Sequence, residues 1–164
     1  MSSMHENIQE NCTWRILKYR DEAAFKQIEA YEVDIFSGNL LLNEGIDELW
    51  KLAAGTGGTK YDNSNAYLGV GDSDTAATAT QTGLQASTNK TYKAMNSGYP
   101  VYGADQKVVF RSTFGTSDAN YDWKEFTVVN ASSDAGKNLN RKVSSQGAKP
   151  SGQIWELELT ITLS

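Results

Sequence analysis

The sequence contains little histidine and cysteine, the side chains that most often bind metals or act as bases and nucleophiles. One histidine, His5, and one cysteine, Cys12, occur among its 164 residues. A lone cysteine cannot form an internal disulfide, and the two residues cannot supply the ligands of a usual Cys/His metal site. A triad hydrolase needs a histidine-like base, and His5 lies in a polar terminal stretch. We therefore interpret Cys12 as a small packing residue and expect no metal ion and no cofactor.

Long hydrophobic runs are absent too. No apolar run approaches the length of about 20 residues that crosses a membrane, and residues 1–9 lack the apolar core of a secretory signal. We expect a protein that is made and folded in a cytoplasm and has no membrane partner. A net charge of −5 and a pI near 4.9 argue against a general nucleic-acid-binding protein, which needs clustered lysine and arginine.

Proline is scarce, whereas glycine and apolar residues are plentiful. Two prolines against fourteen glycines indicate many tight turns, as in all-β folds. Apolar residues make up 39% of the chain, which argues against disorder and is enough for one domain with its own core.

The clearest pattern lies at the end of the chain. Here apolar residues alternate strictly with polar ones: Trp155, Leu157, Leu159, Ile161 and Leu163 against Glu156, Glu158, Thr160 and Thr162. This period of two predicts a long strand with one face in the core and the other face in water, as in an antiparallel sheet. Other strands are predicted over residues 13–19, 25–36, 66–70, 106–114, 121–130 and 139–143.

Helical signals are few. Apolar residues at helical spacing predict one main helix over residues 40–54, with Asn39 or Asn43 as its N-cap and Gly55 as its end. Its apolar face comprises Leu42, Ile46, Leu49, Trp50 and Ala53, and we expect this face to plug a β core. A short helix over residues 22–31 competes with the first part of the strand predicted at 25–36.

These elements predict a mainly β fold. Repeated strand–helix units are missing, which argues against an α/β enzyme fold. We expect an antiparallel, jelly-roll-like β-sandwich of about seven or eight strands with one α-helix. A single domain would cover residues 13–164 and follow a flexible arm, residues 1–12. The arm, in which Ile8 is the main apolar residue, is either a frayed end or a segment that orders on a neighbouring subunit.

Three loops allow more than one interpretation. The glycine-rich residues 55–65 suggest a phosphate loop, but they follow the helix instead of preceding it. Asp72 and Asp74 could share a calcium ion, but the rest of an EF-hand pattern is missing, so a solvated turn is favoured. Residues 75–89 are rich in Ala, Thr, Gln and Ser and suit an extended surface segment or a loop packed on a neighbouring subunit.

Carboxylate pairs are the remaining candidates for catalysis, because glycosidases need only two of them. Glu156 and Glu158 share a strand face, and Asp118, Asp122 and Glu125 lie close in sequence. Their threonine and isoleucine neighbours are typical of an exposed sheet face, so we expect a protein that is not an enzyme.

Three tyrosines lie close together in residues 91–102, namely Tyr92, Tyr99 and Tyr102. Tyrosine rings can stack on sugars or peptides, and they also form core edges and subunit contacts. We take these tyrosines, together with Ile8, as candidate contact residues toward another subunit or a larger assembly.

An ordered series of segments resembles a family of small structural proteins of tailed bacteriophages. The segments that carry this resemblance are residues 38–46, 65–73, 76–84, 109–115, 139–142 and 157–163. The resemblance covers Gly38 to the end of the chain, whereas residues 1–37 look more individual. It implies a component of the virion and carries no catalytic residue with it.

The resemblance leads us to expect a capsid decoration or cement protein that binds the major capsid protein or other virion proteins. Such a protein would be a homo-oligomer, for example a trimer, made in the host cytoplasm and located in the virion. It needs a rigid body, an acidic exterior and an arm that clasps a neighbour. The alternatives are a tail or baseplate-associated protein, and a carbohydrate-binding fibre module that uses Tyr92, Tyr99, Tyr102 or Trp123 as a stacking platform.

Overall fold

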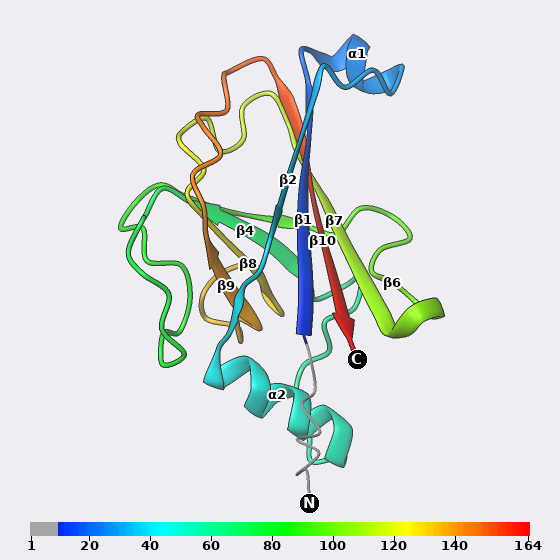
Figure 1. The fold of residues 1–164 in the computed structure, drawn as a ribbon, viewed down its shortest axis with the longest axis vertical. Helices are drawn as coiled ribbons and strands as arrows, with labels where there is room; N and C mark the ends of the chain where they lie inside the picture. Colours follow the sequence, from blue (N-terminus) through cyan, green and yellow to red (C-terminus); the bar gives the residue numbers. More distant parts are fainter. Residues whose placement is uncertain (1–9) are drawn as a thin grey trace, which may run out of the picture.

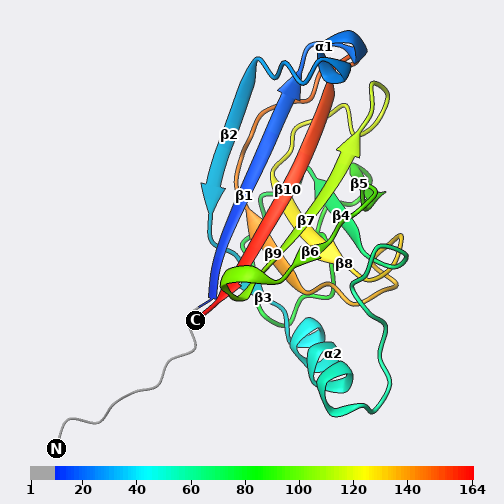
Figure 2. The same cartoon turned by 90° about the vertical axis from the view of Figure 1, so that its right-hand side faces the viewer.

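The computed structural model describes residues 10–164, which form two antiparallel five-stranded sheets (Figures 1 and 2). The first, called the long sheet, has the order β2 (Glu32–Ser37), β1 (Glu10–Tyr19), β10 (Ile154–Leu163), β7 (Lys107–Phe114) and β6 (Val101–Tyr102). The second, called the short sheet, has the order β3 (Leu40–Leu41), β9 (Asn140–Val143), β8 (Glu125–Val129), β4 (Tyr67–Gly71) and β5 (Lys90–Ala94). The predicted antiparallel β-sandwich is confirmed, with more strands than expected because β3 and β6 are short additions.

The centre of the long sheet is the pairing of β1 with β10. Their register runs without interruption from Glu10 opposite Leu163 to Tyr19 opposite Ile154. The strand therefore begins at Glu10, and the expected arm over residues 1–12 is too long at its end, because β10 offers hydrogen-bonding partners to residues 10–12. Ile8, the candidate contact in that arm, lies outside the described residues.

The region after β1 contains a short helix that the sequence allowed as an alternative. The helix α1 spans Glu22–Lys26, and the Asp21 carboxylate accepts a hydrogen bond from the Ala24 amide at 2.8 Å. This cap satisfies a free amide of the first turn, which favours a helix over an early strand. The strand predicted at 25–36 therefore begins only with β2.

The main helix, α2, spans Asn43–Ala54 and ends at Gly55, which has the predicted left-handed conformation with φ 70°. Its start differs from the prediction. Leu42 occupies the N-cap position without a side-chain cap, so neither Asn39 nor Asn43 has that role. Residues 40 and 41 pair with β9 instead, and this pairing delays the helix. A short 3-10 helix, η1, spans Ala104–Gln106.

The core lies between the two sheets and is rich in aromatic rings. Trp123 contacts Trp155 edge-on, with ring centroids 4.9 Å apart, and Phe114 in the same way at 4.8 Å. Such pairs add about 0.5–1.5 kcal/mol beyond their buried area. Cys12 is buried in this core, as predicted for a packing residue. Trp123 is completely buried, so it cannot serve as the sugar-stacking platform considered above.

None of the helices within residues 10–164 is both long enough and apolar enough to cross a membrane.

Candidate functional site

The two glutamates of β10 are not exposed, contrary to the prediction. Glu156 and Glu158 each retain 7% of their surface. Glu158 accepts hydrogen bonds from Arg15 at 3.1 Å and from Arg111 at 3.0 Å. These arginines stand on the strands that flank β10, and their long side chains cover its outer face. The alternation of β10 is as predicted, but its polar face is covered by ion pairs with the neighbouring strands and is not open to water.

Glu156 is equally committed to structural contacts. It accepts hydrogen bonds from the Tyr19 hydroxyl at 3.0 Å, from the Asn96 amide at 3.1 Å and from the Thr113 hydroxyl at 3.3 Å. Burial, followed by the nearby charge of Glu156, raises the pKa of Tyr19 to about 12. The Tyr19 hydroxyl therefore stays protonated at neutral pH and acts as a donor.

A third glutamate forms a buried ion pair in the short sheet. Glu125 on β8 and Arg141 on β9 are both completely buried, with an N–O distance of 2.8 Å. Glu125 also accepts the amides of Gln85 and Ala86, each at 2.8 Å. Arg141 donates to the Thr75 carbonyl at 2.8 Å.

This ion pair fastens residues 75–89 to the chain's own short sheet. Leu84 and Ala86 are buried there. The prediction of an exposed segment or of a loop packed on a neighbouring subunit is therefore wrong for this part of the segment. The sequence contains no local signal for the pairing, because Glu125 and Arg141 meet only when β8 and β9 pair.

The helix α2 is attached to the sandwich through polar groups. The Glu44 carboxylate accepts a hydrogen bond from the Asn138 backbone amide at 2.8 Å, and the Glu48 carboxylate accepts one from the Asn130 side chain at 3.1 Å. Gly45 lets the backbones approach closely, since a Cβ on it would lie 2.7 Å from the Asn138 carbonyl oxygen. The face of α2 that meets the body is therefore its acidic and glycine face.

The apolar face of α2 points away from the core, which corrects the prediction that it plugs the sandwich. Ile46 and Leu49 are exposed, and Trp50 retains 69% of its surface. Only Leu42, just before the helix, is fully buried as expected. The cause is the packing of α2 on the sandwich, because the hydrogen bonds of Glu44 and Glu48 and the close approach at Gly45 turn the acidic face inward.

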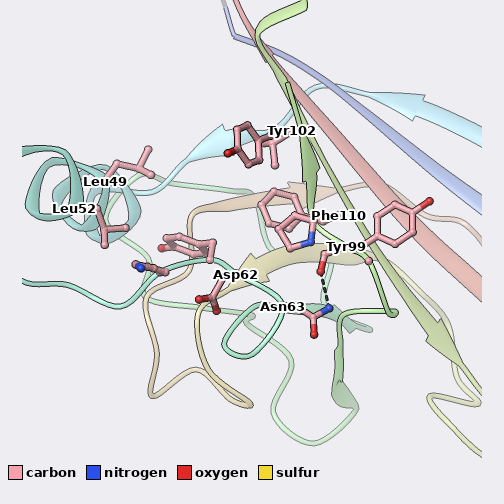
Figure 3. Close-up of a pocket in the computed structure, with 12 residues that line it drawn as sticks. Leu49, Leu52, Asp62, Asn63, Tyr99, Tyr102 and Phe110 are labelled. Carbon is pink, nitrogen blue, oxygen red and sulfur yellow. Dashed lines mark hydrogen bonds between the residues drawn. The ribbon is translucent and has the colours of Figure 1, made fainter. Parts of the chain in front are cut away.

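A groove lies beside this exposed face, between α2 and the β6–β7 edge of the long sheet (Figure 3). It has a volume of about 690 Å³. Its apolar lining includes Leu49, Leu52, Tyr61, Pro100, Tyr102, Val108 and Phe110. The Asn63 side chain donates to the Tyr99 carbonyl at 2.6 Å and ties together two of the lining segments. We call this feature the α2 groove.

Of the three predicted contact residues that lie within residues 10–164, Tyr99 and Tyr102 line this groove. Tyr102 stands at it with 86% of its surface exposed. Tyr99 lines it, but Figure 3 shows its ring turned away from Leu49 and Leu52, and the Arg111 guanidinium lies 5.2 Å from the ring centre. Stacking on Arg111 leaves Tyr99 less available than Tyr102 for a partner.

Tyr92 lies elsewhere, on β5 of the short sheet. Its ring packs over Gly69, where a Cβ would approach it to 2.8 Å, and its hydroxyl is buried. Burial raises the pKa of the Tyr92 hydroxyl well above its ordinary value. Tyr92 is therefore partly buried in the folded body, with its hydroxyl turned inward.

A second exposed apolar surface, which the sequence did not single out, follows α1 and continues along β2. We call it the β2 patch; its members are Ile28, Tyr31, Val33 and Ile35. Val33 and Ile35 share one face of a strand at the sheet edge. Figure 1 shows that α1, where this patch begins, and α2 lie at opposite ends of the molecule.

Ile28 is unusual within the β2 patch. It is 81% exposed and has a positive φ of 58°, a conformation that a β-branched residue rarely adopts. Neither the exposure nor the backbone conformation makes isoleucine a stabilising residue at this position. Its side chain is therefore better suited to contact with another protein than to stabilising this fold.

Asp72, one of the two residues considered for calcium, accepts a hydrogen bond from the Asn89 side chain at 2.8 Å. Within the part of the chain that the structure describes, no three His, Cys, Asp or Glu side chains gather as a metal site would require. In comparisons with known proteins, no family model, no curated protein and no solved structure matches this chain.

Proposed function

We propose that this chain is a non-catalytic structural protein of a bacteriophage virion, a decoration or cement protein that binds and stabilises the shell. The observation that carries the proposal is the pair of exposed apolar surfaces on one sandwich, the α2 groove and the β2 patch along the edge of the long sheet. The resemblance of residues 38–164 to small phage structural proteins supplies the setting.

The physical argument starts from the cost of exposed apolar surface. Monomeric proteins keep contiguous apolar patches small, and larger ones usually mark a contact site. A body with two different surfaces of this kind can hold two neighbours at once. The core of packed Trp and Phe rings between two sheets gives that body the stiffness that a shell-stabilising protein needs.

The arrangement of charged groups supports a structural role over a catalytic one. Glu125, Glu156 and Glu158 each accept two or more hydrogen bonds from fixed neighbours. A catalytic carboxylate must instead reach a substrate from a cleft. The glycan-binding alternative is weakened because Trp123 and the hydroxyl of Tyr92 are buried.

We assign the shell contact to the β2 patch. The strand β2 is the edge of the long sheet, so one row of its backbone groups has no strand partner within the described fold. Such an edge can pair with an extended segment of another protein, and the exposed Val33 and Ile35 would fix the register.

The test uses phage particles that lack this protein. Purified protein added back should occupy regular shell positions in images and raise the temperature at which the particles release their DNA. The variant Ile35→Thr should bind less, whereas Thr88→Ser, an exposed change far from the patch in sequence, should bind normally. Label found on tails alone would refute the shell assignment and favour the tail-associated alternative.

A further inference from the structure

We infer that the α2 groove and the apolar face of α2 beside it form the contact between copies of this chain. In this contact the side chain of Trp50 from one copy enters the groove of the next. The inference concerns the free protein and can be tested without a virion.

The first argument is the orientation of α2. Its carboxylates Glu44 and Glu48 accept hydrogen bonds from the body at 2.8 and 3.1 Å. On the opposite side Trp50 retains 69% of its surface, and Ile46 and Leu49 retain 36% and 40%. Full burial of one such side chain is worth about 1.5–3 kcal/mol. In the monomer the outward-facing apolar side chains of α2 do not contribute this free energy of burial. They contribute it only when a partner covers them.

The second argument is the amount of surface. Trp50 and Tyr102 retain 69% and 86% of their surfaces. An aromatic side chain buries roughly 150–250 Å², so the two together offer about 300 Å². A stable interface needs about 800 Å² from each partner. Exposed Ile46, Leu49 and Val101 beside them, with the walls of the groove, can supply much of the remainder.

The third argument, which selects a second copy as the partner, is the charge around the groove. The charged residues that line it are Lys60 and Asp62, and the exposed charged residues of α2 beside it are Asp47 and Lys51. They cancel, although the whole chain carries −5. A strongly charged partner would find no opposite field here, whereas a second copy would meet a matching surface without repulsion.

The shape of the surface also fits this partner. The groove of about 690 Å³ lies within the range of sites that accept a compact apolar group. Trp50 stands on the same helix as two of its lining residues, Leu49 and Leu52. One copy therefore presents both the projecting ring and the cavity, as a contact between identical chains requires.

The test is sedimentation velocity of the full-length purified chain over a range of concentrations. The wild type should form an oligomer, and Trp50→Ser or Tyr102→Ser should raise the dissociation constant at least tenfold, as expected for a buried aromatic hot spot. Ile35→Thr makes a similar apolar-to-polar change in the β2 patch and should leave the oligomer unchanged. Far-ultraviolet circular dichroism and the melting temperature check that each variant folds.

Three results would overturn the inference. They are a wild type that stays monomeric at every concentration, an oligomer that is indifferent to Trp50→Ser and Tyr102→Ser, and an oligomer lost only when residues 1–9 are deleted, which would make that segment the occupant of the groove. An oligomer that depends on Trp50 but ignores phage particles would support the inference while the proposed function fails.

Discussion

Single residues in this protein show how costly groups are kept in the interior. A buried charge without a partner destabilises the fold by several kcal/mol. The Arg141 guanidinium is completely buried, and it is matched by the Glu125 carboxylate at 2.8 Å and by the Thr75 carbonyl at the same distance. The buried charge of Arg141 is tolerated because Glu125 and Thr75 are held in position to bind it.

Arg141→Met should destabilise the protein by about 3–5 kcal/mol, because it leaves the Glu125 carboxylate buried without its cation. Urea unfolding followed by tryptophan fluorescence measures the loss. The control is Lys26→Met, which breaks the exposed Glu22–Lys26 pair and should change the free energy of unfolding by less than about 1 kcal/mol. Equal effects of the two changes would contradict the view that burial decides the cost.

Lys149 gives a prediction about pH. Its ammonium group is 1% exposed and donates to the Gly115 carbonyl and the Asn120 side chain, and burial lowers its pKa from 10.5 to about 8. Between these values the unfolded chain binds more protons than the folded chain, so this group makes the fold more stable as the pH rises. Below pH 8 the lysine is charged in both states and its contribution stays constant.

The difference in unfolding free energy between the wild type and Lys149→Met should therefore shift in favour of the wild type as the pH rises from 7 to 9.5. This range stops below the ordinary pKa of tyrosine, where Tyr19 begins to contribute with the opposite sign. A difference that does not vary with pH would show that the folded state does not perturb Lys149.

Ile28 gives a prediction about backbone strain. With φ at 58° and its side chain 81% exposed, it adopts a conformation that costs a β-branched residue about 1–2 kcal/mol. Ile28→Asn should therefore raise the melting temperature, since asparagine enters this region more easily. If the Ile28 side chain contacts the phage shell, the same variant should bind phage shells more weakly while being more stable.

At the scale of elements, α2 shows that an amphipathic pattern does not by itself say which face turns inward. The apolar and polar residues of α2 lie on separate faces, as the sequence indicated, but the polar face packs against the sandwich. The contacts that decide this are long-range, between Glu44 and Asn138 and between Glu48 and Asn130.

Gly45→Ala tests this seating. Its Cβ would lie 2.7 Å from the carbonyl oxygens of Asn138 and Leu139, which are backbone atoms and cannot move aside easily. We expect a loss of about 1–3 kcal/mol by overpacking, even though alanine is the better helix former. Asp47→Ala, at an exposed position of the same helix, is the control and should leave stability nearly unchanged.

At the scale of the whole molecule, the long sheet fixes where the fold begins. The strand β1 pairs with β10 from Glu10 onward. A deletion through Cys12 should therefore lower the melting temperature below that of a chain that lacks residues 1–9 alone, because it also removes the paired residues 10–12 and the core side chain of Cys12. Circular dichroism melting of both variants measures this difference. Equal melting temperatures would contradict the assignment of residues 10–12 to the folded sheet.

The mainly β class of the fold could be predicted from local patterns in the sequence. Strict alternation predicted β10, β7 followed from its own apolar pattern, and left-handed Gly55 ended α2 as expected. These features are local, because the period of side chains and the conformational freedom of glycine act within a few residues.

Which faces of these elements are buried depends on contacts between distant segments, and local patterns do not contain that information. Glu158 is covered because arginines from β1 and β7 bind it, and Glu156 is covered because Tyr19, Asn96 and Thr113 donate hydrogen bonds to it. Trp50 is exposed because Glu44 and Glu48 bind the body through the other face of α2. A periodic pattern separates two faces of an element, but the neighbours that cover each face come from distant parts of the chain. That is the physical reason why the strands could be predicted while the contact surfaces could not.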